Sequence, residues 1–184
     1  MKIMKKEVYE TIRKRALEFY DKASIALTPA EREAVEVADF GLGDIERVGL
    51  ILVTYINTKR CCAKEMVLFP GMTCPEHTHA PIPEKDYPGK EETFRCRWGS
   101  VYLYVEGEAT KDRRGSVPAG YEGTYTVFHE VILHAGEQYT MEPNTKHWFQ
   151  AGPEGAVISE FSTPSFDEYD IFTDENIRRA PVVE

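Results

Sequence analysis

The segment CPEHTHAPIPEKDYPGKEETFRCRWG contains several side chains that could bind a metal ion. His77 and His79 are separated by one residue, so on an extended segment both imidazoles project from the same face. If EETFRCRW is a strand, Glu92 lies on its apolar face together with Phe94. A carboxylate enclosed in a barrel is strongly unfavourable unless it is paired or bound to a cation. The spacing therefore predicts a cation site that contains His77, His79 and Glu92.

A further ligand is expected from a strand that is distant in the sequence. In EPNTKHWFQ, His147 follows a predicted tight turn, where Asn144 tolerates a positive φ. The strand that begins there projects His147 and Phe149 to one face. His129 and His134 have no comparable turn or partner, and we interpret them as ordinary strand or surface residues. The candidate metal ligands are therefore His77, His79, Glu92 and His147.

Two kinds of elements must position these ligands. Apolar residues recur at helical spacing from Lys5 to Tyr20, and a second helix is predicted at TPAE, where Thr28 and Glu31 can form a capping box. After residue 40, short apolar segments separated mostly by Gly, Pro or Asn predict strands. These segments are VGLILVTYIN, AKEMVLFPG, TFRCRW, VYLYVEG, TVFHEVIL, EQYTM, KHWFQAG and GAVISEFS. The pattern indicates a mainly β fold, an antiparallel sandwich or barrel with the helices packed outside.

The composition suits one domain, in which residues 1–40 form a helical segment and residues 41–184 the barrel. The chain has 184 residues, of which 42% are apolar, and a net charge of -9, which makes nucleic acid and an anionic membrane poor partners. Its apolar runs are shorter than the roughly 20 residues of a membrane span, and its N-terminus is too charged for a signal peptide. We therefore expect a cytoplasmic protein. The four cysteines fit neither a disulfide framework nor paired zinc knuckles, which indicates reduced thiols.

Two spacings resemble the paired motifs of the cupins. The first is Gly71-x5-His77-x-His79 followed by Glu92-x6-Gly99, with a longer insertion than usual between His79 and Glu92. The second is Gly136-x5-Glu142-x-Asn144-x2-His147, with Glu142 in place of the usual proline and Asn144 in place of the usual glycine. Neither replaced position supplies a ligand. The resemblance implies a cupin jelly-roll barrel with three histidines and one glutamate around a divalent cation.

Within the cupins, the chain is more similar to the D-lyxose isomerase family, whose members depend on manganese. The similarity covers most of residues 39–175, in the segments CPEHTHAP, GKEETFRCRWGSVYLYVEGE, YTMEPNTKHWFQAGPEGAVISEFST and DIFTD. It implies an isomerase that interconverts free D-lyxose and D-xylulose through a cis-enediol, with D-mannose and D-fructose as a second pair. It also implies manganese, although the ligand set would accept iron, cobalt or zinc as well. By family analogy the chain is expected to form a homodimer.

Such a reaction needs a base for the C2 proton, a group that returns a proton to C1, and positive charge near the enediolate oxygens. Glu160 in AVISEFS shares a face with two apolar residues of its strand, which makes it the candidate base. Lys90 precedes the glutamate ligand by two residues and could polarise a sugar oxygen or transfer a proton. Asp170 in YDIFTD is a candidate for binding a sugar hydroxyl. Phe149 is a candidate for contact with the C–H groups of the sugar.

Each of these assignments has an alternative. The ligand set could consist of polar residues that only form hydrogen bonds, Glu160 could be a surface carboxylate on an edge strand, and Lys90 could be a solvated loop residue. An iron-dependent cupin dioxygenase would use the same ligands, and a sugar-binding cupin would bind its ligand without turnover. A phosphosugar isomerase has less support, because the sequence has no Gly-rich phosphate cradle and Arg95 and Arg97 fall on the outward face of their strand.

Overall fold

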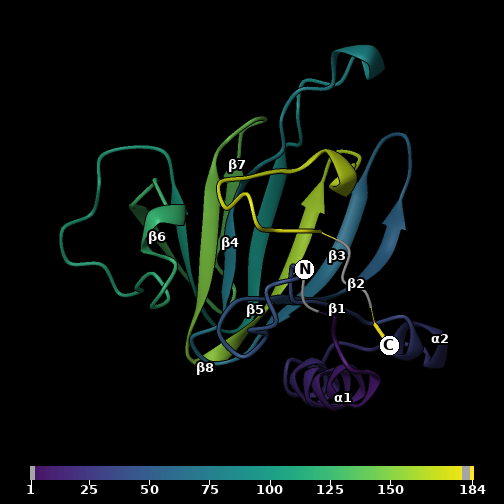
Figure 1. The fold of residues 1–184 in the computed structure, drawn as a ribbon. Helices are drawn as coiled ribbons and strands as arrows, with labels where there is room; N and C mark the ends of the chain where they lie inside the picture. The colour runs from purple at the N-terminus through teal and green to yellow at the C-terminus, as the bar shows by residue number, and fades with distance from the viewer. Residues whose placement is uncertain (1–2, 180–182) are drawn as a thin grey trace.

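The structure is a computed structural model that describes residues 3–179 and 183–184. The helices are α1 (Lys6–Lys22), α2 (Pro29–Glu33) and the short 3-10 helices η1 (Pro83–Lys85), η2 (Glu122–Thr124) and η3 (Asp167–Tyr169). The strands are β1 (Glu36–Ala38), β2 (Leu50–Asn57), β3 (Cys62–Leu68), β4 (Thr73–Thr78), β5 (Glu92–Val105), β6 (His129–His134), β7 (Gln138–Met141), β8 (His147–Ser162) and β9 (Ile171–Phe172). The strands curl into a barrel with the helices outside it, so the prediction of a mainly β cupin fold is confirmed (Figure 1).

The first helix packs against the outside of the barrel. Its buried residues include Ile12, Ala16 and Phe19, which recur at the helical spacing seen in the sequence. Figure 1 shows α1 below the strands, and the ring of Phe19 packs edge to face against Trp98 of β5, with their centroids 5.5 Å apart. The predicted helix over residues 5–20 is therefore present, and its apolar face covers one end of the barrel.

The second helix begins with the predicted capping box. The backbone N–H of Glu31 donates to Oγ1 of Thr28 at 3.2 Å, and the backbone N–H of Thr28 donates to Oε2 of Glu31 at 2.7 Å. Two of the amide groups that a helix N-terminus leaves unpaired are thereby satisfied. The chain then returns to the sheet through β1, which pairs antiparallel with β2.

Strand β8 connects the two halves of the barrel. The strands follow the order β1-β2-β3-β8-β4-β9, and β5 pairs with β6, β7 and β8. The first half of β8 lies between β4 and β5, and its second half lies between β3 and β5. All of these pairs are antiparallel. His147 at the start of β8 pairs with His77 near the end of β4 and with Val105 at the end of β5. Inside the barrel its side chain also lies 3.1 Å from that of Glu92, at the start of β5.

Two glycines explain why some predicted strand boundaries are wrong. TFRCRW and VYLYVEG form the single strand β5, and KHWFQAG and GAVISEFS form the single strand β8. Gly99 has a φ of 72° and Gly155 a φ of 93°, and both lie at an irregularity in the pairing of β5 with β8. A glycine with positive φ in this position marks a bulge in a continuous strand instead of a turn between two strands. A Cβ on Gly99 would lie 2.0 Å from the carbonyl oxygen of Gly155, so the two backbones approach each other closely.

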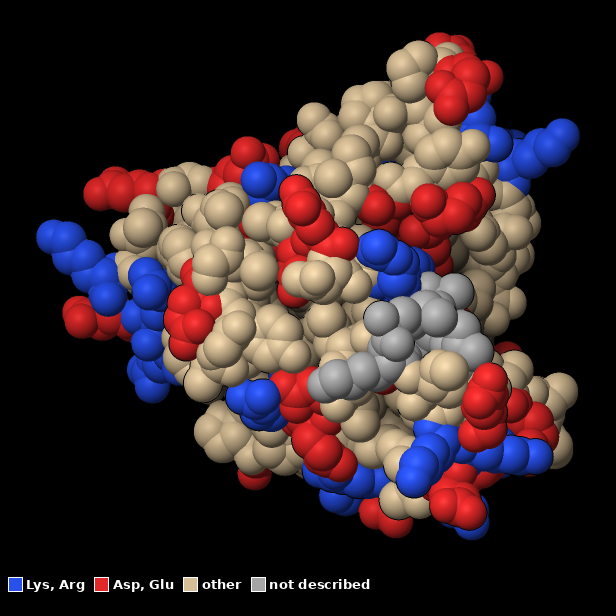
Figure 2. Space-filling model, in the orientation of Figure 1, with Lys and Arg blue, Asp and Glu red and all other residues tan. Residues whose placement is uncertain are grey.

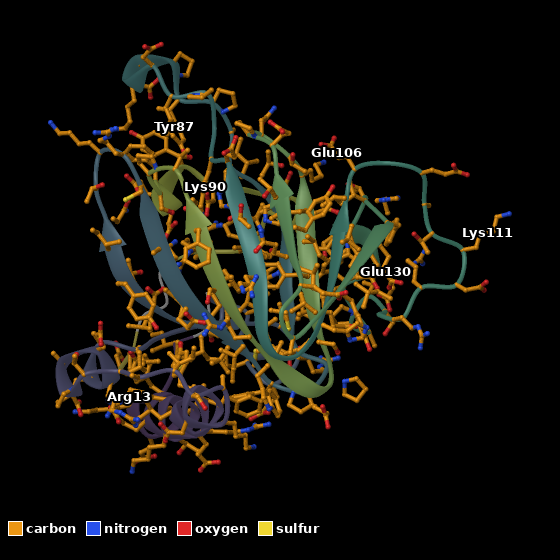
Figure 3. All side chains as sticks on the ribbon, turned by 180° about the vertical axis from the view of Figure 1, so that it is seen from behind. Arg13, Tyr87, Lys90, Glu106, Lys111 and Glu130 are labelled. Carbon is orange, nitrogen blue, oxygen red and sulfur yellow. The ribbon has the colours of Figure 1, made fainter. Side chains whose placement is uncertain are left out.

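Two segments lie close to the end of the barrel that is remote from α1. Figure 3 shows Lys90 at this end, opposite Arg13 of α1, and the segment between β4 and β5 projects beyond it (Figure 1). The C-terminal segment, drawn in yellow in Figure 1, crosses in front of the strands. Both segments contribute residues to one cavity, His79 and Lys90 from the first and Asp167, Asp170 and Phe172 from the second.

On the face shown in Figure 2, Lys and Arg side chains are interspersed with Asp and Glu. Among the described residues, neither α1 nor α2 combines the length and the apolar character that crossing a membrane requires.

Candidate active site

The four predicted metal ligands meet inside the barrel. His77 lies near the end of β4, His79 directly follows this strand, and His147 begins β8, where it pairs with His77. One ring nitrogen from each of these histidines lies within 4.8 Å of the other two, and all three side chains are buried. Glu92, the first residue of β5, places Oε1 3.3 Å from Nε2 of His79 and 3.1 Å from Nε2 of His147.

Backbone carbonyl groups hold the second ring nitrogen of two of these histidines. Nδ1 of His77 lies 2.8 Å from the carbonyl oxygen of Pro75, and Nδ1 of His147 lies 3.0 Å from that of Thr145. Because a carbonyl oxygen can only accept, Nδ1 carries the hydrogen and donates it. In a neutral ring this leaves the lone pair on Nε2, which is the arrangement of histidines that ligate metals.

A divalent cation would satisfy two polar atoms that have no hydrogen-bond partner in the described structure. They are Oε1 of Glu92 and Nε2 of His147, both buried. A buried polar atom without a partner is unfavourable and calls for an explanation. Three imidazole nitrogens and one carboxylate oxygen form a donor set that manganese, iron, cobalt and zinc can all use. The residues present therefore fit a divalent cation without choosing the ion.

The charges at the site agree with cation binding. Burial, reinforced by the neighbouring histidines, holds the pKa of His77 well below its usual value, so this ring is neutral near neutral pH. Burial would lower the pKa of His79, but the Glu92 carboxylate raises it to about 9. Burial would raise the pKa of Glu92, but Lys90 and the histidines hold it well below its usual range. A cation would therefore meet an ionised Glu92 and displace a proton from His79.

Lys90 and Glu160 form a buried ion pair beside the histidines. Nζ of Lys90 lies 2.5 Å from Oε1 of Glu160 and 3.1 Å from Oε2 of Glu92. Lys90 is 4% exposed and Glu160 is 3% exposed, so neither side chain lies at the surface. Burial would lower the pKa of Lys90, but Glu160 and Glu92 hold it well above its usual range, so Lys90 is an ammonium group.

One small cavity is lined by the two predicted sugar contacts and by five of these side chains, His77, His79, Lys90, Glu92 and Glu160. The cavity volume is about 30 Å³, and its lining includes Asp170 and Phe149. Oδ1 of Asp170 accepts a hydrogen bond from Nδ1 of His79. Phe149 is buried and packs edge to face against Phe94, with their centroids 4.9 Å apart. The apolar part of the wall is formed by Phe40, Leu50, Leu52, Met66, Phe94, Phe149 and Phe172.

Three charged residues that the sequence analysis did not select line the same cavity. Nζ of Lys64 on β3 lies 2.9 Å from Oδ1 of Asp167, and Nη2 of Arg179 lies 3.3 Å from Oδ2 of Asp167. Lys64 is buried and pairs with Glu160 in the register of β3 and β8. For Lys64 the sequence offers one signal, strand parity, because Lys64 shares the inward face of β3 with Met66. Asp167 begins the short helix η3 and Arg179 lies in the irregular segment that follows β9, and neither has such a signal.

Comparisons with known proteins agree with the family resemblance. The sequence model of the D-lyxose isomerase family matches residues 21–184. A D-lyxose/D-mannose isomerase of Thermosediminibacter oceani is 59% identical over 182 residues, which are 99% of both chains. A D-lyxose ketol-isomerase of Cohnella laeviribosi is 62% identical over 172 residues, which are 94% of this chain and 93% of that protein.

A solved structure with much lower sequence identity shares the fold. The L-ribose isomerase of Cellulomonas parahominis, determined with no ligand, superposes with a TM-score of 0.79 and covers 100% of both chains at 16% identity. The likeness therefore includes the outer helix as well as the barrel.

Proposed function

Since this chain belongs to the D-lyxose isomerase family and is an aldose-ketose isomerase, we propose that it interconverts free D-lyxose and D-xylulose. D-mannose and D-fructose are the second pair, as the name of the Thermosediminibacter oceani relative suggests. Both conversions move a carbonyl group between C1 and C2, and we infer that they proceed by proton transfer through a cis-enediol.

One structural observation carries the chemical part of this proposal. A buried carboxylate and a buried ammonium group, Glu160 and Lys90, line the same cavity as three candidate metal ligands, His77, His79 and Glu92. The fourth candidate ligand, His147, lies 3.1 Å from Glu92. The three functions that isomerisation needs are therefore available in one place: a base, a hydrogen-bond donor for charged oxygens, and a cation site. Burial of a carboxylate-ammonium pair costs desolvation free energy without a clear gain in stability, which supports a catalytic role for this pair over sugar binding alone.

Glu160 is the proposed base. Its carboxylate takes the proton from C2 of the aldose and returns a proton to C1 of the enediol, while the hydroxyl proton of O2 passes to O1, so that the carbonyl group moves from C1 to C2. Lys90 donates a hydrogen bond to the sugar oxygen that gains negative charge as the C2 proton leaves. Its pairing with Glu160 and Glu92 keeps Lys90 charged, so we assign it to charge stabilisation in preference to proton transfer. The apolar wall limits the access of water and so strengthens both interactions.

We propose that His77, His79, Glu92 and His147 hold a divalent cation, and that the ion is manganese. When bound, the cation supplies fixed positive charge beside the oxygens of the sugar. The hydrogen bonds at Nδ1 keep the rings of His77 and His147 turned so that Nε2 faces the site.

Asp170 and Phe149 are the proposed sugar contacts. Oδ1 of Asp170 is engaged with His79, and we assign Oδ2 to a sugar hydroxyl. The face of the Phe149 ring suits the C–H groups of a pentose. Both residues line the cavity that also contains Glu160, which supports these assignments.

We further propose that the protein is a homodimer in the cytoplasm, with residues 1–40 packed on the barrel of residues 41–184 as one domain. Exposed apolar side chains support the dimer: Phe161 is 50% exposed and Ile56 is 46% exposed. Light scattering coupled to size-exclusion chromatography tests the assembly, because a monomer mass at micromolar concentration would contradict it.

The function is tested with chelated protein that is resupplied with manganese and given a panel of free aldoses, headed by D-lyxose and D-mannose. We expect metal-dependent formation of the matching ketose, D-xylulose or D-fructose. Absence of ketose from every sugar, with manganese verified in the protein, would contradict the isomerase proposal. Oxygen uptake under these conditions would then favour the dioxygenase, and sugar binding without turnover the binding protein.

The route of the hydrogen is tested in the same reaction run in deuterium oxide. Transfer by Glu160 allows exchange with solvent, so we expect deuterium at C2 of the recovered aldose. Its complete absence would indicate a hydride shift and would remove the proposed role of Glu160 as a base.

A further inference from the structure

A segment near the C-terminus is bound along the strand that carries the first histidine ligand. We define the C-terminal strap as residues 165–178. Within it, β9 pairs antiparallel with β4, so that Phe172 lies opposite His77 and Ile171 lies opposite Thr78. In Figure 1 the strap is the yellow segment that crosses in front of the strands. Its residues Asp167, Asp170 and Phe172 form part of the wall of the cavity.

Two side chains of the strap reach the candidate metal site: the ring of Phe172 lies 5.5 Å from that of His77, centroid to centroid, and Asp170 forms a hydrogen bond with His79. Oδ1 of Asp170 accepts the hydrogen bond from Nδ1 of His79, and both side chains are nearly enclosed, at 8% and 9% exposure. A backbone carbonyl fills the same role for His77 and His147. His79 is therefore the one candidate ligand among these histidines whose outer partner belongs to a segment that binds from elsewhere in the chain.

A second side chain fastens the strap three residues further on. Oγ1 of Thr173 donates to Oε1 of Glu76 at 2.6 Å, and the backbone N–H of Thr173 donates to the carbonyl oxygen of Glu76 at 3.1 Å. Glu76 is buried on β4, and it also accepts from the backbone N–H of Thr126 at 2.6 Å. This anchor holds the strap through Glu76, which is not a candidate ligand and directly precedes His77 in β4.

We propose that Asp170 is a positioning residue that couples docking of the C-terminal strap to binding of a divalent cation at His79. The inference rests on the cation site of the proposed function. The carboxylate of Asp170 fixes the hydrogen of His79 on Nδ1, sets the orientation of the ring and makes Nε2 a better donor. When the strap is docked, cation binding is stronger. By thermodynamic linkage, a bound cation must stabilise the docked strap by the same factor.

The coupling has a consequence for the sugar. The cavity behind the strap has a volume of about 30 Å³, room for only about two water molecules, so a pentose needs a part of the wall to move. Asp167, Asp170 and Phe172 of the strap belong to this wall. Because a bound cation stabilises the docked strap, we expect the strap to close this part of the cavity wall when the cation is bound.

The first test measures the dissociation constant of manganese near neutral pH, from the electron paramagnetic resonance signal of free Mn²⁺. We expect Asp170→Ala to weaken binding about 10- to 100-fold, and Asp170→Asn, which retains a neutral acceptor, to weaken it less. The matched control is Glu168→Gln, because Glu168 is exposed on the same strap and its substitution also removes one negative charge. This control should bind manganese as tightly as the unmodified protein. Circular dichroism verifies that each variant is folded.

The second test separates coupling from a local effect of Asp170. Thr173→Val removes the side-chain anchor to Glu76 and leaves the His79 contact intact, so we expect faster amide hydrogen exchange in the strap and weaker manganese binding. In the Asp170→Ala background the same Thr173 substitution should have no further effect on manganese binding. Manganese should slow amide exchange of the strap in the unmodified protein and leave it unchanged in Asp170→Ala.

The outcomes separate this inference from the proposed function. If the unmodified protein binds no manganese, both the cation site and the coupling are wrong. If it binds manganese but Asp170→Ala binds it equally well, the positioning role alone is wrong. If Thr173→Val loosens the strap without changing manganese affinity, or manganese leaves exchange of the strap unchanged in the unmodified protein, the coupling is wrong.

Discussion

Nζ of Lys90 lies 2.5 Å from Oε1 of Glu160, and both side chains are closed off from solvent inside the barrel. Glu92 is a second carboxylate within 3.1 Å of the same ammonium group. One ammonium group therefore faces two buried carboxylates, and a metal ion bound by the histidines would add positive charge beside Glu92. Substitution of Lys90 and substitution of Glu160 should therefore have different effects, because only Glu160 is assigned a proton-transfer role.

Lys90→Met should lower the free energy of unfolding by about 3 to 5 kcal/mol, because it leaves the two carboxylates buried without their ammonium partner. The measurement is urea denaturation of the metal-free protein. Lys59→Met is the matched control: Lys59 is exposed in the turn between β2 and β3, and its substitution should change stability by less than about 0.5 kcal/mol. The double variant Lys90→Met/Glu160→Gln should recover part of the loss. Equal stability of the Lys90 and Lys59 variants would contradict the buried ion pair.

Glu160→Gln should retain the fold and lower kcat by about 100- to 10,000-fold, because the amide cannot accept the C2 proton. The KM for the sugar should change much less, since the shape of the side chain is preserved. Glu154→Gln, an exposed position on the same strand β8, is the matched control and should turn over normally. Exchange of the C2 proton with solvent should fall together with kcat. Near-normal turnover of Glu160→Gln would remove Glu160 from the chemistry.

The candidate ligands are predictable from the sequence because local backbone rules decide where they point. Strand parity places Glu92 inward, and Phe94 follows it to the same face, as the burial of both shows. The turn before His147 was recognisable from Asn144, which has a φ of 65°. Strand parity and turn conformation depend on a few neighbouring residues, so they can be predicted before it is known which strands pair.

Other parts of the fold were not predictable, because they depend on pairing between distant segments. β1 and β9 are only three and two residues long, too short for a periodic pattern, and β4 contains Pro75, which weakens a strand signal. Trp98 follows a register shift after Cys96, so simple alternation does not place it, and it packs against helix α1 instead. The contact of Asp170 with His79 joins residues that are far apart in the chain.

Removal of the metal should lower both activity and thermal stability. A cation at 100 times its dissociation constant stabilises the folded state by about 2.7 kcal/mol, which corresponds to about 5 to 10 °C in Tm for a chain of this length. A chelator should therefore lower Tm by about that amount, and manganese should restore it. His147→Ala should abolish the manganese-dependent shift, whereas His134→Ala, at an exposed position of β6, should preserve it. A shift that persists in His147→Ala would place the cation elsewhere.

The ion pair between Lys64 and Asp167 should make stability depend on pH in the acid range. Burial would raise the pKa of Asp167, but Lys64 and Arg179 hold it well below its usual range. Because the folded-state pKa is lower than the unfolded value of about 3.9, the stabilisation is complete above about pH 4 and is lost as the pH falls further.

Asp167→Asn should therefore lower the free energy of unfolding by about 2 kcal/mol near neutral pH, less than for a fully buried pair because the Asp167 side chain is 30% exposed. The difference between this variant and the unmodified protein should shrink below about pH 4. Urea denaturation across the acid range measures it, with Asp112→Asn, an exposed position, as the control. A difference that stayed constant from neutral to acid pH would show that the Asp167 carboxylate is not stabilised by Lys64 and Arg179, and that the variant loses stability for another reason.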